Sequence, residues 1–297
     1  MRRRNLPYYV ATKTFKTSED TIRKEIDAQL KRLNVETIDF YHIWCITTPE
    51  DWDSRKKDGI ITTFRKLKEE GLIRHICVSS HLTHDQIDTL LKEEVFEGVL
   101  FNYSAYNFRS REIAFNAVRT RKLGAAVMNP LGGGIIPDHP ELFGFIMRPG
   151  ESAVQAGLRF IWDHKDISTT LVGFSNENDV NDALAAMDGY KPRSEAELAA
   201  VKETTSESFD GLCTGCGYCD TCPVGVPVPK YMDAYNKKIL RAEDDTALQQ
   251  RLYWFWSLLP KEAGACTSCG SCESACTQHL PIIERLKQIA PLKPFSP

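Results

Sequence analysis

Short apolar runs alternate with amphipathic, charged segments over the first two thirds of the chain. The apolar runs are rich in β-branched and aromatic residues and predict strands at 8–13, 37–44, 73–79, 98–104, 124–130 and 168–173. The segments between them carry apolar residues at helical spacing, as Ile22, Ile26 and Leu30 do. These segments predict helices at 18–33, 60–70, 83–91, 110–122, 152–164 and 178–187.

This order amounts to six strand–helix units, each of about 30 residues, which is the usual size of such a unit. Strict alternation predicts a parallel sheet with helices outside it. The repeat and the lack of an early G-x-G-x-x-G motif favour a (β/α) barrel over a doubly wound sheet. A complete barrel has eight units, so the predicted fold class is α/β, with an incomplete TIM-type barrel over residues 1–190.

Eight of the ten cysteines lie in two short runs near the end of the chain. The spacings are C-x2-C-x2-C-x2-C-P and C-x2-C-x2-C-x3-C, and glycines lie inside both runs. Three thiolates on one short loop can surround a single cluster, while the fourth ligates the other cluster, as in two-cluster ferredoxins. We therefore expect two [4Fe–4S] clusters with crossed ligation. One would be held by Cys213, Cys216, Cys219 and Cys276, and the other by Cys266, Cys269, Cys272 and Cys222.

Two structural zinc sites, each held by four cysteines, are the alternative. Zinc modules usually combine separated C-x2-C pairs, whereas these runs are compact triplets, so the spacing favours iron–sulfur clusters. Disulfides would need an oxidising compartment, and nothing in the sequence indicates secretion.

The segment between the two runs predicts helices at 230–240 and 246–259. This pattern suits a small α-helical ferredoxin-like domain over residues 191–297. The aromatic residues at 253–256 would either shield a cluster from water, which tunes its potential, or dock this domain on the barrel.

Composition narrows the function classes. The formal charge of −3 and the pI near 6.2 show no footprint of nucleic-acid binding. The chain has no apolar run of about 18 residues, so no membrane span is expected. The basic start is followed by Leu6 and Pro7 rather than by the apolar core of a signal peptide, and a reducing, cytoplasmic compartment is predicted.

Several landmarks resemble the aldo-keto reductase family, and specifically its branch with a C-terminal iron–sulfur domain. They are ATK at 11–13, IDFY at 38–41, GLIR at 71–74, VSS at 78–80, FNY at 101–103, NPLGG at 129–133 and LVGFS at 171–175. The resemblance covers essentially the whole chain. It implies an NAD(P)H-dependent reductase of aldehydes and ketones on an eight-stranded barrel, with an Asp, Tyr, Lys and His tetrad at the strand ends.

Within that tetrad, the candidate catalytic residues here are Lys13 and His42. Lys13 matches the family lysine, which lowers the pKa of the tyrosine that protonates the carbonyl. Trp44 stands at the position of the family histidine. His42 lies on the same face of that strand and would replace the histidine after a local shift; otherwise it is a histidine satisfied within the core.

The family's Asp and Tyr belong to two units that precede residue 8 of this sequence. Three explanations fit: an N-terminally shortened form of a complete enzyme, a barrel completed by another chain, or loss of the family chemistry.

The resemblance also implies a cofactor site. The matching positions are Ser79, Ser80, Asn102, Tyr103, Pro130, Leu131, Gly132, Gly173, Ser175 and Asn176. The first four would line the nicotinamide pocket, the next three the pyrophosphate, and the last three the adenosine and 2′-phosphate before a helix N-terminus. NADP(H) is therefore the implied nicotinamide, although no cationic partner for its 2′-phosphate is apparent at 174–182.

The predicted function is an iron–sulfur oxidoreductase that moves electrons between a nicotinamide-type cofactor or carbonyl substrate and two [4Fe–4S] clusters. The alternative is a non-catalytic electron-transfer or assembly subunit with a degenerate barrel. Expected partners are a redox protein or a small carbonyl compound, and either a homo-oligomer or a second chain that completes the barrel.

Overall fold

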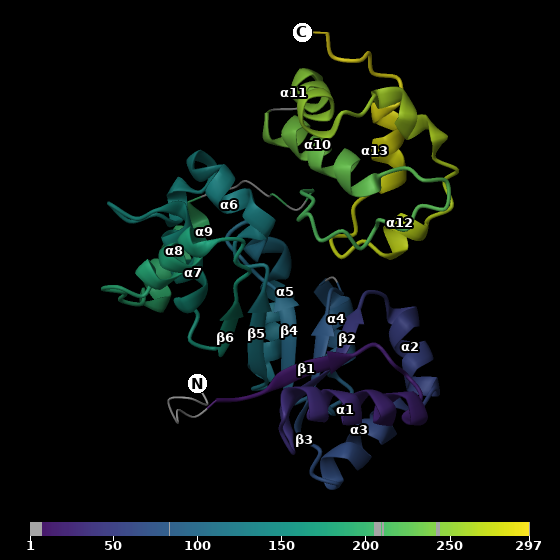
Figure 1. Ribbon diagram of the computed structural model, residues 1–297. Coiled ribbons are helices and arrows are strands. Elements are labelled where there is room, and N and C mark those ends of the chain that lie inside the picture. Colours follow the sequence, from purple (N-terminus) through teal and green to yellow (C-terminus); the bar gives the residue numbers. More distant parts are fainter. Residues whose placement is uncertain (1–7, 83, 205–208, 210, 242–243, 297) are drawn as a thin grey trace.

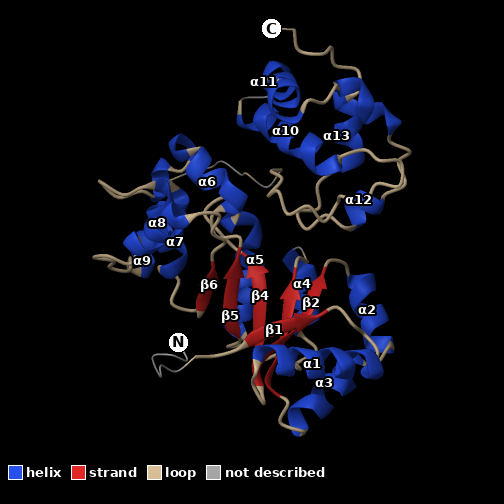
Figure 2. Ribbon diagram, in the orientation of Figure 1, coloured by secondary structure: helices blue, strands red, loops and turns tan. Residues whose placement is uncertain are grey.

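The computed structural model describes residues 8–82, 84–204, 209, 211–241 and 244–296. Six parallel strands form one curled, open sheet whose order follows the chain (Figure 2). The strands are β1 Ala11–Thr14, β2 Ile38–Ile46, β3 Ile73–Ser80, β4 Gly98–Asn102, β5 Gly124–Met128 and β6 Thr169–Leu171. The predicted incomplete TIM-type barrel is confirmed.

Helices follow the strands and cover the outer face of the sheet (Figure 1). They are α1 Glu19–Leu33, α2 Pro49–Lys57, α3 Ile60–Glu69, α4 His84–Leu91, α5 Phe108–Thr120, α6 Ile135–Asp138, α7 Ala153–Trp162, α8 Glu177–Ala185 and α9 Glu195–Glu203. The C-terminal part holds α10 Val228–Leu240, α11 Asp245–Gln250, α12 Ser271–Ser274 and α13 Ile282–Ile289. Shorter helical turns are η2 Gly132–Gly134, η3 Pro140–Leu142, η4 Gly144–Ile146, η5 Arg251–Trp256 and η6 Pro260–Ala265. Among the described helices, none is both long and apolar enough to cross a bilayer.

The helix boundaries follow from local sequence. At the start of α7, the Ser152 hydroxyl accepts from the Gln155 N–H, and the Gln155 side chain accepts from the Ser152 N–H. This reciprocal capping box satisfies backbone donors that have no partner inside the helix. At the end of α3, Gly71 has a φ of +77°, a left-handed conformation that is strained for residues with a Cβ.

Two of the longer helices, the short helices α6 and α12, and one helix type were not predicted. Segment α2 is almost entirely polar, with Trp52 as its one large apolar residue, so no apolar periodicity marks it. Helix α13 follows the second cysteine run, in a part of the sequence whose prediction rested on the cysteine spacing. The single α-helix predicted over 246–259 is wrong: α11 ends at Gln250 and continues as the π-helix η5.

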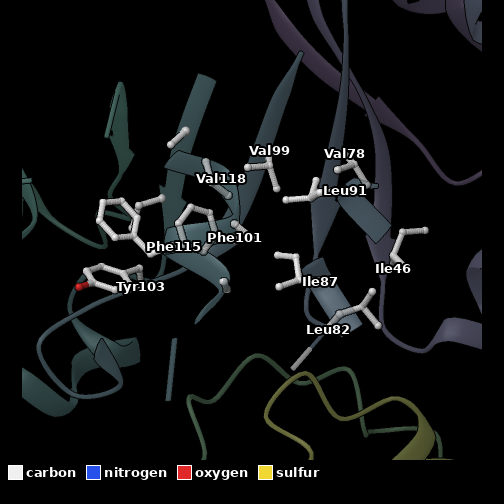
Figure 3. Close-up of a cluster of buried hydrophobic side chains, with 14 of the residues drawn as sticks. Ile46, Val78, Leu82, Ile87, Leu91, Val99, Phe101, Tyr103, Phe115 and Val118 are labelled. Carbon is white, nitrogen blue, oxygen red and sulfur yellow. The ribbon is translucent and has the colours of Figure 1, made fainter. Parts of the chain in front are cut away.

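Two separate hydrophobic clusters form the cores. The larger one lies between the sheet and its helices and includes Phe101 and Phe115, which stack within the group drawn in Figure 3. The smaller one lies in the C-terminal part around Tyr231 and Met232. Leu198 of α9 belongs to the larger cluster, and the predicted boundary at residue 190 stays a prediction.

The C-terminal part sits over one end of the sheet. In Figure 1 the arrowheads of β2, β4 and β5 point toward it, so the carboxyl ends of the strands face its loops. Because active sites of (β/α) barrels form at this end, the fold brings the cysteine-bearing loops to the expected place of the chemistry.

Candidate functional site

A cavity of about 770 Å³ opens between the strand ends and the C-terminal loops. Its floor comes from all six strands, with Lys13 from β1, Trp44 from β2, Ser79 from β3, Asn102 from β4, Met128 from β5 and Leu171 from β6. Its roof is formed by residues of the cysteine-bearing loops, namely Thr214, Cys216, Tyr218, Thr277 and Gln278. The cavity is thus shared by the two predicted domains.

Lys13 is the cation on the cavity floor. Its Nζ lies 4.1 Å from the centre of the Trp44 ring, and the edge of Phe15 packs against the same indole at 5.0 Å. An ammonium at this distance is attracted by the negative face of the ring. Lys13 is therefore held at the strand end where the resemblance places a catalytic lysine.

A bulge at the end of β2 fixes the position of Trp44. The register between β2 and β3 shifts between Ile43 and Ile46, and Cys45 has a left-handed φ of 62°. The buried Arg55 donates to the Trp44 carbonyl oxygen at 2.8 Å. Bulges beside active sites commonly turn one side chain out of the regular alternation, and here Trp44 lines the cavity.

Eight of the predicted small-molecule site residues line the cavity. They are Lys13, Ser79, Asn102, Pro130, Leu131, Gly173, Ser175 and Asn176. The other four do not line it. They are His42, Ser80, Tyr103 and Gly132.

Those four side chains or positions have other neighbours. The His42 ring lies 3.2 Å from the Thr12 carbonyl oxygen, and burial lowers its pKa. The Tyr103 hydroxyl lies 3.0 Å from His164, inside the core shown in Figure 3. The Ser80 hydroxyl accepts from the Leu82 N–H. Gly132 packs against the ring of Tyr106.

The start of α8 already has an acidic partner. The Asn176 side chain accepts from the backbone N–H groups of Asn178 and Asp179. The Asp179 carboxylate accepts from the Ser175 N–H at 2.7 Å and from the Asn176 N–H at 3.3 Å. Donors that would otherwise be available to a phosphate are therefore engaged with a carboxylate.

His81 is a cavity residue that the sequence analysis missed. It is 8% exposed, lines the cavity, and faces the edge of the Tyr218 ring at 6.3 Å. Burial and the nearby charge of Arg111 lower its pKa to about 3, so the imidazole is neutral at pH 7. Its position directly after β3 was the available signal, because every strand end of a barrel faces the same side.

The roof is fixed to the floor by several contacts. The Gln278 Oε1 accepts from the Tyr106 hydroxyl at 2.8 Å, and His279 donates to the His81 carbonyl oxygen at 2.9 Å. A Cβ at Gly133 would lie 2.2 Å from the Thr214 carbonyl oxygen, so the two backbones touch. The cysteine loops are thus packed directly on the barrel.

The structure brings together the first predicted set of four cysteines, here named the first cysteine site. Its members are Cys213, Cys216, Cys219 and Cys276. Burial, followed by the charges that the other three sulfurs would carry, raises the pKa of Cys219 to about 12. Iron would offset this cost, because a thiol that coordinates a metal is deprotonated outright.

The second set, here named the second cysteine site, lines a small cavity of its own. The lining includes Cys222, Cys266, Cys269 and Cys272, together with apolar side chains such as Ile283 and Leu286. The residues that line it all belong to the C-terminal part of the chain. These are the two groupings that crossed ligation requires, and the ligation itself stays a prediction.

The thiols of both sites fit an iron–sulfur cluster. Backbone N–H groups donate to sulfur at both sites, from Gly215 to Cys213 and from Ser268 to Cys266. Such hydrogen bonds are a standard way to tune clusters. All ten cysteines are free of disulfides. Among the described residues, no three His, Cys, Asp or Glu side chains converge as ligands of a single ion.

Comparison with known proteins agrees with this geometry. The profile of the Aldo/keto reductase family matches residues 2–205, and that of a 4Fe-4S dicluster domain matches residues 212–283. L-galactose dehydrogenase from Arabidopsis thaliana is 26% identical over 231 residues, covering 67% of this chain and 68% of that protein.

Two solved structures share the fold. The holo form of aldo-keto reductase AKR11C1 from Bacillus halodurans superposes with a TM-score of 0.58 at 21% identity, covering 70% of this chain and 75% of that one. A structure titled putative 2,5-diketo-D-gluconic acid reductase B gives a TM-score of 0.55 at 19% identity, covering 68% and 70%. The dicluster match favours iron–sulfur clusters over the zinc alternative.

The barrel, the cavity at its strand ends and the family match over residues 2–205 lead to one conclusion: this chain belongs to the aldo/keto reductase family and carries a C-terminal 4Fe-4S dicluster domain.

Proposed function

We propose that the protein moves electrons between a ligand bound in the cavity and two [4Fe–4S] clusters held by the two cysteine sites. The observation that carries the proposal is the shared lining: Cys216 of the first cysteine site faces the same cavity as Lys13, Trp44 and His81. A ligand on the barrel floor is therefore next to a predicted cluster ligand, which makes direct electron exchange feasible.

The electron count fits two clusters. Reduction of a carbonyl to an alcohol needs two electrons and two protons, and a [4Fe–4S] cluster exchanges one electron at a time. A redox partner protein that gives or takes single electrons would exchange them at the second cysteine site, whose cysteines lie outside the cavity and include the exposed Cys269. The Lys13 ammonium is the cavity group best placed to donate a proton to, or stabilise negative charge on, a carbonyl oxygen.

A nicotinamide is the second ligand to test in this cavity. Oxidation of NADH to NAD⁺ releases one proton and two electrons, which again matches two one-electron acceptors. Asp179 occupies the N–H groups at the start of α8, and a carboxylate there repels a 2′-phosphate. We therefore propose NADH as the first nicotinamide to test, with NADPH as the comparison.

The alternative of a non-catalytic electron-transfer subunit has one observation in its favour. Lys13 stacks on Trp44, an indole that cannot transfer protons as the family's imidazole does. A barrel that only supports the dicluster domain would need no proton donor on its floor. The same experiment separates the two functions.

The test is a single-turnover measurement on anaerobically purified protein. Clusters are reduced with dithionite, excess reductant is removed, and small aldehydes and ketones are added one at a time. We expect reoxidation of both clusters, seen as recovery of absorbance near 400 nm, with one alcohol formed for every two electrons. In the reverse arm, NADH added to oxidised protein should bleach the clusters. Reducible clusters that respond to neither class would instead favour the electron-transfer subunit.

A further inference from the structure

A chain of side-chain hydrogen bonds joins the cavity floor to the first cysteine site. Asn102 Nδ2 donates to the Tyr106 hydroxyl at 3.1 Å, and that hydroxyl donates to Gln278 Oε1 at 2.8 Å. Gln278 Nε2 donates to Thr277 Oγ1 at 3.2 Å, and this oxygen lies 3.4 Å from Cys216 Sγ. The chain crosses from β4 and the loop after it to the loop that follows Cys276.

When Cys216 is a thiolate, each residue of the chain donates a hydrogen bond to the next one, from the cavity floor toward Cys216. Thr277 Oγ1 accepts from Gln278, so its own proton is available to the sulfur. A thiolate has no proton and can only accept. Hydrogen bonds arranged head to tail polarise one another, so the last donor is strengthened by those behind it.

Three of the five residues in the chain are shielded from water, which preserves their electrostatic effect, whereas Gln278 is half-buried and Cys216 is exposed. Asn102 is 2% exposed, Tyr106 is 3% exposed and Thr277 is 1% exposed. At the cavity end, Asn102 Oδ1 is buried without a hydrogen-bond partner among the described residues. An N–H or O–H group brought to this oxygen would add one more donor to the start of the chain.

We propose that Thr277 and Gln278 are positioning residues that raise the reduction potential of the first cluster and couple it to the cavity floor. This inference rests on the proposed function, because it requires a cluster at the first cysteine site. A hydrogen bond to a ligating sulfur stabilises the reduced cluster, which carries more negative charge. Loss of the chain therefore lowers the potential of this cluster and leaves the other cluster unchanged.

The test is an anaerobic redox titration of the whole protein, followed by EPR, with both clusters loaded. Thr277→Val removes the hydroxyl that contacts Cys216, and Tyr106→Phe removes the hydroxyl that donates to Gln278, leaving the longer 3.4 Å bond from Asn102 Nδ2 to Gln278 Oε1. We expect Thr277→Val to lower the potential of one cluster, and Tyr106→Phe to lower the same potential by less. The other cluster should keep its wild-type value in both variants.

The double variant distinguishes a chain from two local effects. Without the Thr277 hydroxyl the chain no longer reaches the sulfur, so removal of the Tyr106 hydroxyl should not change the potential of the first cluster any further. We expect Thr277→Val with Tyr106→Phe to match Thr277→Val alone. Additive shifts would overturn the coupling between floor and cluster.

A matched control is available at the second cysteine site. Ser271 Oγ lies 3.5 Å from Cys269 Sγ, so Ser271→Ala removes a hydroxyl–sulfur contact that does not reach the cavity. Ser271→Ala should change the reduction potential of the cluster at the second cysteine site. Adding Tyr106→Phe should not change that potential further.

The two levels of inference fail separately. Protein that carries eight irons and two reducible clusters, yet keeps both potentials in Thr277→Val, would overturn the hydrogen-bond chain and leave the proposed function standing. Protein without reducible clusters would remove the proposed function itself. Iron content of each variant, measured alongside, shows whether a lost signal reflects a lost cluster rather than a shifted potential.

Discussion

The two cysteine sites have similar ligands but different surroundings. The first shares a cavity with the strand ends of the barrel, and its loops contact the barrel through Gln278, His279 and Thr214. The second is lined by residues of the C-terminal part and its cysteines do not line the cavity, although Cys216 and Cys269 are both exposed. In the proposed function this difference separates the roles of the two sites: the first faces the reacting ligand, and the second exchanges electrons with a partner.

The largest expected effect comes from exchanging one ligand at each site. Cys276→Ser should remove the cluster beside the cavity, although Cys276 belongs to the second cysteine run, because the predicted ligation is crossed. Cys272→Ser should remove the other cluster. Each variant should lose about half of the iron. In Cys272→Ser, ligands added to the cavity should still reoxidise the remaining cluster, which is the first. In Cys276→Ser, they should have no effect on the remaining cluster, which is the second.

Iron analysis and single-turnover spectroscopy check this prediction. If Cys276→Ser retained the cluster that responds to the cavity, the assignment of the first cysteine site would be wrong. Loss of both clusters in both variants would show that neither site folds without the other, and EPR of partially loaded wild-type protein would then decide the assignment.

The next effect concerns the charge on the cavity floor. Lys13→Met keeps the length of the side chain and removes the ammonium, so the carbonyl loses its proton donor. Carbonyl reduction should slow by about 10²–10⁴-fold, the usual contribution of a general acid. The exposed Lys16, just beyond β1, provides the control, and Lys16→Met should keep the wild-type rate. Equal rates in both variants would exclude Lys13 from the chemistry.

The contact between barrel and first site can be broken by one methyl group. In Gly133→Ala the new Cβ would lie 2.2 Å from the Thr214 carbonyl oxygen, so the loop carrying Cys216 must move. We expect a loss of about 3 kcal/mol in unfolding free energy, from overpacking and the left-handed backbone together. The EPR signal of the first cluster should change, whereas that of the second should not.

Gly134→Ala is the matched control for this prediction. Gly134 also has a positive φ, of 102°, but its nearest neighbour to a new Cβ is Asp138 at 3.9 Å. The control carries the backbone strain without the clash. Denaturant unfolding and EPR of both variants would contradict the prediction if Gly133→Ala behaved like Gly134→Ala.

The sequence was informative wherever a local pattern determines the structure. Short apolar runs located all six strands, and the cysteine spacing predicts the two groups of four thiols that lie near one another in the structure. The polar helix α2 left no such pattern, yet it carries Arg55, which fixes Trp44 at the cavity. Its role depends on a contact between residues of different elements, and periodicity does not encode that.

The same limit applies to the floor and roof of the cavity. Gln278 becomes a site residue only when the dicluster domain is placed on the barrel, since it lies in a loop with no motif of its own. His81 had only its position directly after β3 as a signal. Tyr103 shows the converse. Its position after β4 matched the family pocket, but its hydroxyl meets His164 in the core instead. A position at a strand end predicts that a residue lies near the site, but side-chain packing determines whether it faces the ligand.

The smallest expected effect is the response of the barrel to acid. Burial, and then the nearby Lys202 ammonium, lower the pKa of His164 from 6.5 to about 4. Because the folded pKa is depressed, the unfolded chain binds a proton first as pH falls, so stability is complete above pH 6.5 and is lost between pH 6.5 and 4. The slope should approach about 1.4 kcal/mol per pH unit within that window.

His164→Gln should flatten this slope. The measurement is denaturant unfolding at several pH values, with EPR of both clusters at each. Since only the first cysteine site is packed on the barrel, acid should disturb its signal before that of the second. Simultaneous loss of the two signals would mean that the dicluster domain carries both sites independently of the barrel, and the difference between them would then not arise from their surroundings.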